Sequence, residues 1–187
     1  MQPCIFDIAA RLTALKDMIT DKRFVRLVNT CIPAGFYDAP GAMKHHHAFR
    51  HGLSLHTAEV AEVAVSMLEC SGESFTDYDF DVLLTASLLH DLGKVWEYNI
   101  DLQTDTITYG SFTIGHVVKS VMYMVECNAT MDCESLKPHV IDDIAAVMLA
   151  HHGFSDWGTP KNCAVDNKRA TLLQAIIHSA DMVSAGK

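Results

Sequence analysis

A histidine and an aspartate stand side by side where a strongly apolar segment ends. Apolar residues recur at helical spacing up to Leu89, so His90 and Asp91 fall in the last turn of a predicted helix, which Gly93 is expected to end. A carboxylate at the edge of a core must be paired, hydrogen-bonded or bound to a metal, and the adjacent imidazole favours a metal. The plain alternative is an aspartate in solvent at a helix end, so the pair needs partners elsewhere in the chain.

Further histidines and aspartates stand at the ends of other predicted helices or among their apolar residues. Each one alone is compatible with a core histidine or carboxylate that a nearby group satisfies, and for a single residue that is the commoner situation. A set that recurs along nearly every long helix is harder to explain by packing, because each buried imidazole or carboxylate needs its own partner. The set consists of His56, His90, Asp91, His116, His151, His152 and Asp181.

Composition indicates a globular domain and disfavours several functions. The 187 residues, 49% of them hydrophobic, fit one domain with a single core. Because 14 basic residues face 23 acidic ones, the formal charge of -9 disfavours a long nucleic-acid-binding face, whereas a small phosphorylated substrate is easier to accommodate. The 6 cysteines include no C-x-x-C pair, which is typical of reduced thiols in a cytosolic protein.

The apolar segments contain no membrane signal. Residues 1–20 lack the basic start and uninterrupted apolar run of a signal peptide, and no later segment approaches membrane-spanning length. We therefore expect a soluble, cytoplasmic protein with no membrane partner. The sequence leaves the oligomeric state open and is compatible with a homo-oligomer.

Hydrophobic periodicity predicts helices along most of the chain. Asp77 is expected to cap the helix that ends at His90, and Pro138 to occupy the first turn of another helix. A small β-hairpin is predicted from segments 99–102 and 106–109. The predicted helices span residues 5–19, 21–31, about 56–72, 77–91, 116–125, 138–152 and 172–181, with irregular connections at 32–44 and 154–165.

One predicted helix, which Gly115 and His116 open, is apolar over a broad surface. Its methionine content favours core packing over a cofactor site, so we expect these side chains to pack in the core. They are Val117, Val118, Val121, Met122, Met124 and Val125.

The ordered set of histidines and aspartates resembles the HD superfamily of metal-dependent phosphohydrolases. Within it, the chain is similar to the HD domain of bacterial 3′-5′ exoribonucleases that join an OB-fold to an HD domain. The similarity extends over residues 36–184. The segments that carry it are Ala39-Pro40, His46-His47-Ala48-Phe49, Gly52-Leu53-Ser54-Leu55-His56, Leu89-His90-Asp91-Leu92-Gly93-Lys94, Gly115-His116, His151-His152-Gly153, Trp157-Gly158-Thr159-Pro160 and His178-Ser179-Ala180-Asp181.

The resemblance implies an all-α fold, an HD-domain helical bundle with a small β-hairpin excursion. It implies a single domain over residues 1–187, with N-terminal helices in 1–35 and the HD core in 36–187. In such a bundle the helices converge on one or two metals. By this analogy the first ion is held by His56, His90, Asp91 and Asp181, and the second by His116, His151 and His152, with Asp91 bridging the two.

Roles for further residues follow from the same resemblance. Imidazole and carboxylate ligands together suit Mn, Fe, Co, Ni or Zn better than Mg, and two such ions activate water and neutralise charge on a phosphoryl group. Asp91 and Lys94 are therefore the expected catalytic residues, with Lys94 contacting phosphate or, alternatively, lying solvated in a last helical turn. We expect His46 and His47 to contact the substrate or to support the metal ligands. Arg50 or Lys44 is expected to contact a second phosphate, and His178 to orient a ligand. No role is expected for His45 and His51.

The expected function is hydrolysis of a phosphomonoester or phosphodiester bond in a nucleotide or short oligonucleotide by a metal-activated water. Because no OB-fold precedes the HD core in this sequence, the catalytic apparatus carries over better than the RNA substrate. One alternative is a 3′-5′ exoribonuclease-like nuclease. The other is a non-catalytic HD module that binds a nucleotide or a partner protein, which the complete set of ligands disfavours.

Overall fold

The computed structural model describes residues 4–111, 113–153 and 168–186, and only the backbone of 168–170. Within these residues the chain is helical apart from one small two-stranded sheet, so the predicted all-α fold with a β-hairpin is confirmed. The expected loop 154–165 and the segment Trp157-Gly158-Thr159-Pro160 lie outside the described residues. The elements are α1 (Ile5–Asp17), α2 (Lys22–Cys31), α3 (Gly52–Cys70), α4 (Asp77–Leu89), α5 (Lys94–Glu97), β1 (Tyr98–Ile100), β2 (Ile107–Tyr109), α6 (His116–Ala129), a 3-10 turn (Asp132–Glu134), α7 (Pro138–Ala150) and α8 (Lys168–Ser184).

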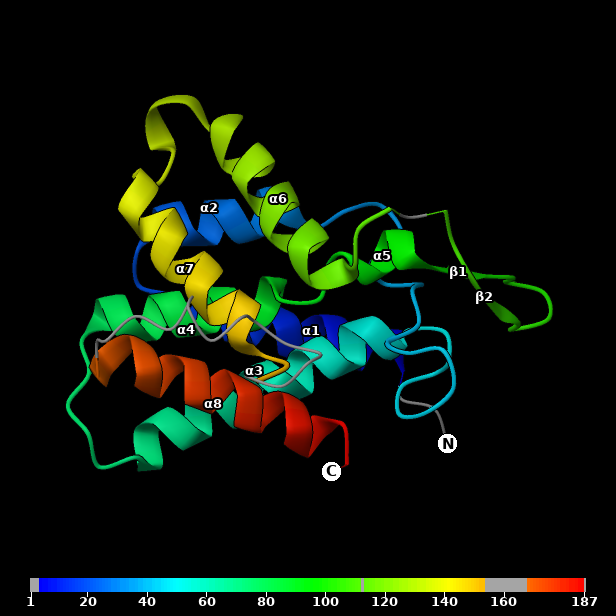
Figure 1. Ribbon diagram of the computed structural model, residues 1–187, viewed down its shortest axis with the longest axis horizontal. Helices are drawn as coiled ribbons and strands as arrows, with labels where there is room; N and C mark the ends of the chain where they lie inside the picture. Colours follow the sequence, from blue (N-terminus) through cyan, green and yellow to red (C-terminus); the bar gives the residue numbers. More distant parts are fainter. Residues whose placement is uncertain (1–3, 112, 154–167, 187) are drawn as a thin grey trace.

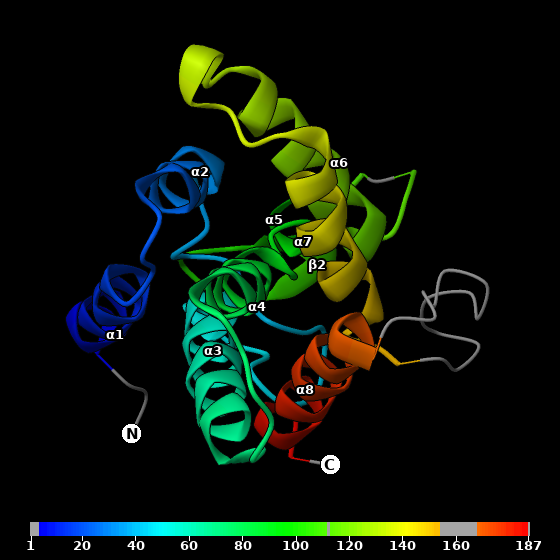
Figure 2. The same ribbon diagram turned by 90° about the vertical axis from the view of Figure 1, so that its left-hand side faces the viewer.

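Four long helices pack in a closed arrangement around the core. Helix α3 contacts α4 and α8, and α7 contacts the same two helices from the opposite side, as the end-on view in Figure 2 shows. Helix α1 packs against α3, while α2 packs against α4 and α6. The β1–β2 hairpin pairs Tyr98 with Tyr109 and projects away from the helices (Figure 1). The division of the chain at residue 35 stays a prediction.

The N-cap of helix α4 lies one residue before the predicted one. Thr76, not Asp77, is the N-cap, because its hydroxyl accepts a hydrogen bond from Asp79 N while Asp79 Oδ2 accepts one from Thr76 N at 2.7 Å. This reciprocal capping box satisfies two backbone donors, whereas an aspartate cap satisfies one. The predicted Pro138 start of α7 is confirmed.

The helix α4 also ends earlier than the sequence suggested, and Gly93 has a different role from the one expected. Helical hydrogen bonding ends at Leu89, and Gly93 has a right-handed φ of -57°, so it is no left-handed helix cap. Glycine is needed at this position because there is no room for a side chain: a Cβ would lie 2.2 Å from the carbonyl oxygen of His116. The Gly93 N–H donates to Ser120 Oγ at 2.8 Å. The turn that carries Asp91 is therefore pressed directly onto the first turn of α6.

The helix α6 contributes less to the core than its composition predicted. Met124 is fully buried, but Val118, Met122 and Val125 are 48%, 46% and 47% exposed. The physical reason is that α6 packs along one side only, against α2, α5 and α7, so its opposite face has no neighbour among the described residues. Among those residues, no helix combines the length and apolar character needed to cross a membrane.

Substituting Gly93 tests the close approach of the two segments. In Gly93→Ala the new Cβ collides with the backbone of His116, and we expect a loss of about 1–3 kcal/mol in the free energy of unfolding. Chemical denaturation measures it. Gly115→Ala is the matched control, because a Cβ there meets nothing within 4 Å. Equal stability of the two variants would contradict the packing described here.

Candidate metal centre

The structure brings all the predicted ligand residues to one place. They come from the ends or inner faces of five helices, because α3, α4, α7 and α8 surround the point that the start of α6 also reaches. Their potential ligand atoms form overlapping groups in which all atoms lie within 4.8 Å of one another. These groups are His56, His90 and Asp181; His90, Asp91 and His151; and His116, His151 and His152.

Asp91 lies between two sets of imidazoles. Its Oδ2 is 3.3 Å from Nε2 of His56 and 3.3 Å from Nε2 of His90. Its Oδ1 is 3.5 Å from Nε2 of both His116 and His151. Each oxygen therefore faces its own set of ring nitrogens. Asp91 is 1% exposed, so the carboxylate is buried in the interior.

Local hydrogen bonds decide which ring nitrogen of each histidine faces the centre. The Nδ1–H of His90 donates to the carbonyl of Ser87 at 2.8 Å, and that of His151 donates to the carbonyl of Met148 at 2.6 Å. Both acceptors lie three residues earlier, in the last turn of α4 or α7, where carbonyls lack the helical partner four residues later; the Met148 carbonyl also accepts the backbone N–H of His151 at 3.4 Å. The same contact thus completes the helix end and turns Nε2 inward.

The inward nitrogens of His90, His116 and His151 carry no proton when Nδ1 of each ring is protonated. A neutral imidazole with its proton on Nδ1 is an acceptor at Nε2, and an ionised carboxylate accepts only. Among the described residues, no hydrogen bond reaches Nε2 of His116 or His151 or either Asp91 oxygen, although Lys94 Nζ lies 2.5 Å from Oδ2. Buried acceptors that converge without donors fit a bound cation.

Except at His56, the protonation states also fit metal ligands, which must be deprotonated to bind. Burial would raise the pKa of Asp91, but Lys94 and His90 hold it well below its usual range, and His56 lowers the pKa of Asp181 against the same effect of burial. Burial lowers the pKa of His90, and burial together with His151 lowers that of His152 to about 4. For His56, burial acts downward, but Asp181 and Asp91 raise its pKa overall.

Lys94 lies inside the centre and not in solvent. Its side chain is 9% exposed, and the ammonium pairs with Asp91 one turn earlier. The alternative of a solvated lysine is therefore wrong. This buried ammonium offsets the charge of the Asp91 carboxylate and lies beside the imidazoles that surround Asp91.

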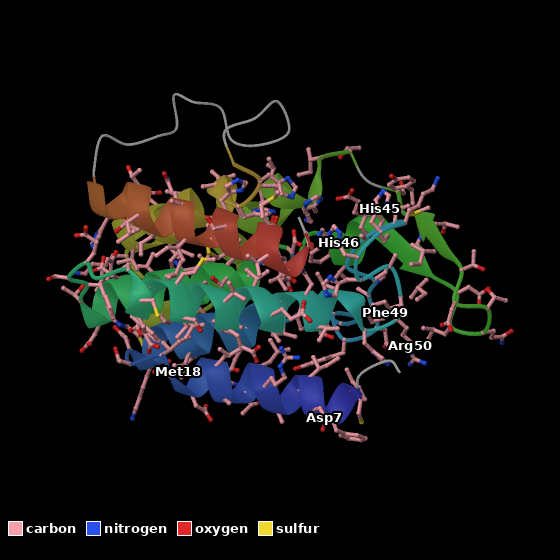
Figure 3. The ribbon with its side chains drawn as sticks, turned by 90° about the horizontal axis from the view of Figure 1, so that it is seen from below. Asp7, Met18, His45, His46, Phe49 and Arg50 are labelled. Carbon is pink, nitrogen blue, oxygen red and sulfur yellow. The ribbon has the colours of Figure 1, made fainter. Side chains whose placement is uncertain are left out.

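The histidines of the loop before α3 have separate surroundings. The ring centroid of His46 lies 6.3 Å from that of His56, whereas His47 is buried with Nε2 2.9 Å from Glu59 Oε2. Arg50 binds Asp38 through two nitrogens, at 2.9 and 2.8 Å. Figure 3 shows His45, His46, Phe49 and Arg50 gathered at one end of the molecule, in the connection before α3.

His178 supports the centre through the backbone. Its Nδ1 lies 2.7 Å from the carbonyl oxygen of His151, so the ring holds the turn that carries two of the candidate ligands. From helical spacing alone, the partner predicted for the His178 ring is the carboxylate of Asp181, three residues later on the same helix. Gly153 has a φ of +76°, and a Cβ on it would lie 2.8 Å from the His178 ring. The ring therefore packs directly on this turn.

Sequence reasoning missed the carboxylates and the hydroxyl behind the ligands. Glu97 Oε2 lies 2.5 Å from Nδ1 of His116 and accepts the backbone N–H of that residue at 3.1 Å. Ser184 Oγ lies 2.9 Å from Nδ1 of His56 and donates to Glu59. Such partners orient metal-binding imidazoles and raise their basicity. No spacing rule could reveal them, because Glu97 and Ser184 lie 19 and 128 positions from their histidines.

Comparisons with known proteins agree with this geometry. A family model for the HD domain matches residues 53–186. The chain is 33% identical over 150 residues to the 3′-5′ exoribonuclease YhaM of Listeria monocytogenes serotype 4b (strain CLIP80459), covering 80% of this chain and 44% of the relative. It is 29% identical over 155 residues to the protein of the same name from Bacillus subtilis (strain 168), covering 83% and 46%. The chain spans less than half the length of these curated relatives, and no solved structure matches it.

The low pKa of His152 predicts a pH-dependent stability of the metal-free protein. Below about pH 6.5 the unfolded chain takes up a proton at His152, whereas the folded chain takes it up only near pH 4. Unfolding therefore becomes easier as the pH falls through this window. We expect chelator-treated wild-type protein to lose more stability than His152→Gln on acidification, measured by chemical denaturation. His45→Gln, at an exposed position, controls for loss of an imidazole, and parallel losses in wild type and His152→Gln would contradict the prediction.

Proposed function

The chain belongs to the HD domain family, and from this premise we propose that it is a metal-dependent phosphohydrolase that cleaves a phosphodiester or phosphomonoester bond by attack of water. The observation that carries the proposal is the buried Asp91 carboxylate, which faces imidazole nitrogens at both oxygens; Lys94 pairs with Oδ2, whereas no hydrogen bond from the described residues reaches Oδ1. A bound cation satisfies such converging acceptors, and mixed nitrogen and oxygen ligands suit Mn, Fe, Co, Ni or Zn.

The two faces of Asp91 support two ion positions. We assign the first to His56, His90, Asp91 and Asp181, and the second to His116, His151 and His152, with Asp91 Oδ1 turned toward them. Divalent ions, when bound, lower the pKa of water and offset charge that builds on a phosphoryl group. The chain itself supplies the fixed geometry, because a hydrogen bond at Nδ1 aims Nε2 of His56, His90, His116 and His151.

Lys94 is the residue we propose to contact the substrate phosphate. Its ammonium is already buried at Asp91, so a phosphoryl oxygen that reaches the centre meets a positive charge with little remaining hydration. His46, close to His56, is a second proposed contact. A phosphate contact by Arg50 would require its guanidinium to leave Asp38, which binds it.

The substrate class we propose is a nucleotide or short oligonucleotide. Relatives named as 3′-5′ exoribonucleases favour a phosphodiester of RNA, and a 3′-5′ exoribonuclease-like activity is therefore the second candidate. The formal charge of -9 favours short substrates over long ones, because a long polyanion gains little from an acidic surface. The cysteine usage of the sequence favours action in a reducing, cytoplasmic compartment.

Substitutions of Asp91 and His116 test the assignment. We expect the protein loaded with manganese to hydrolyse a chromogenic phosphodiester. In Asp91→Asn the activity is expected to fall about a hundredfold or more, and most of the metal to be lost, because both sets of ligands share this residue. His116→Gln is expected to lose only the ion of the second set. Metal analysis by atomic emission and steady-state kinetics measure the two effects, with His45→Gln as the control.

The assignment would be wrong if Asp91→Asn kept full metal content and activity. The function itself would be wrong if wild-type protein, shown to carry its metal, turned over no phosphate ester with any of the candidate ions.

Single-stranded RNA and mononucleotides separate the two candidate activities. We expect release of mononucleotides from a 5′-labelled oligoribonucleotide, with the rate falling as the chain lengthens because of charge repulsion. Gel electrophoresis follows the stepwise shortening of the labelled strand. Hydrolysis of mononucleotides to nucleosides and phosphate, with no shortening of the RNA, would instead show a nucleotidase.

A further inference from the structure

A chain of hydrogen bonds leads from His56 to the loop before α3. Nδ1 of His56 lies 2.9 Å from Ser184 Oγ, and this hydroxyl donates to Glu59 Oε2 at 2.8 Å. Nε2 of His47 lies 2.9 Å from the same carboxylate oxygen. Two of these side chains belong to α3, while Ser184 ends α8 and His47 lies in the loop, so the chain ties three separate segments together.

Glu59 determines the direction in which the protons of this chain point. A carboxylate only accepts, so the Ser184 hydroxyl and His47 Nε2–H both donate to it. The Ser184 oxygen, whose proton points to Glu59, accepts the Nδ1–H of His56. The neutral His56 ring therefore carries its proton on Nδ1 and offers a lone pair at Nε2, which lies 3.1 Å from Asp181 Oδ1.

Glu59 is suited to this role because it is charged at neutral pH. Burial raises the pKa of its carboxyl group, but hydrogen bonds from His47 and Ser184 outweigh burial and lower the pKa below its usual value. Glu62, one turn later on α3, has a different environment, since its carboxylate forms a bidentate pair with Arg11. The two glutamates therefore form a natural pair for comparison.

The loop holds His47 in a conformation that a non-glycine residue rarely adopts. Its φ is 58°, and a non-glycine residue keeps such a strained conformation only where its surroundings hold it. Gly41 N–H donates to the His47 carbonyl at 2.8 Å, and a Cβ on Gly52 would lie 1.9 Å from that oxygen. The ring is 9% exposed as a result. Close glycine packing thus presses the ring against Glu59 and not toward solvent.

We propose that Glu59, together with Ser184 and His47, is a positioning residue that fixes the orientation and tautomer of the His56 ring and thereby sets metal affinity at the first ion position. The affinity part rests on the proposed function, whereas the tautomer is a property of the metal-free protein. This assignment also gives His47 a role behind a ligand in place of contact with the substrate.

Nitrogen-15 NMR of the histidine rings in metal-free protein, in alkaline buffer where the rings are neutral, reads the tautomer directly. Wild type is expected to show His56 with the proton on Nδ1. In Glu59→Ala the freed Ser184 hydroxyl turns to donate to Nδ1, so a mixture of tautomers is expected. Glu62→Ala is the matched control and is expected to keep the wild-type tautomer.

Zinc affinity, measured by competition with a fluorescent chelator, gives the second readout. We expect Glu59→Ala and Ser184→Ala to raise the dissociation constant roughly 10- to 100-fold. Ser184→Thr keeps the hydroxyl and is expected to restore affinity, which a role in packing alone would not predict. If Glu59→Ala fails to fold, the two Ser184 variants decide the question.

Wild-type tautomer and zinc affinity in both alanine variants would overturn the proposal. A wild-type protein that bound no zinc or manganese would instead overturn the proposed function, and the tautomer comparison would still decide the role of Glu59.

Discussion

The buried carboxylate of Asp91 is the constraint on which the rest of the structure depends. An ionised group that is 1% exposed must have its charge compensated, and the free energy of leaving it uncompensated exceeds that of most single packing interactions. Lys94 supplies one positive charge by direct contact. The other neighbours are imidazoles whose lone pairs face the carboxylate, so full compensation depends on cations that those rings can also bind.

The fold meets this constraint with one local device used at two helix ends. At the ends of α4 and α7, a histidine closes the helix with an Nδ1–H bond to a carbonyl three residues earlier and turns Nε2 toward the centre. The remaining imidazoles receive their orientation from side chains, Glu97 for His116 and Ser184 for His56. Orientation of the centre therefore relies partly on secondary structure, which is rigid, and partly on individual long-range hydrogen bonds.

Close backbone contacts bring these elements within reach of one another. Gly93 allows the turn after α4 to touch the backbone of His116, and Gly52 allows the start of α3 to touch that of His47. In both places a side chain would separate the segments by the width of a methyl group. Ligand atoms that lie 3 to 4 Å apart cannot tolerate such a displacement, which explains why glycine stands beside the centre and not only in turns.

The sequence by itself determined the helices, the hairpin and the set of candidate ligand residues such as His56, Asp91 and Asp181, because hydrophobic period and chemical type are local properties of the chain. The sequence did not reveal that Thr76 caps α4, that Gly93 is needed for close packing, or that Met122 is exposed. The roles of Gly93 and Met122 depend on which segment lies opposite them in the fold. Only the tertiary structure decided that Glu59, Glu97 and Ser184 orient the ligands. Their hydrogen bonds join residues whose spacing in the chain carries no trace of their distance in space.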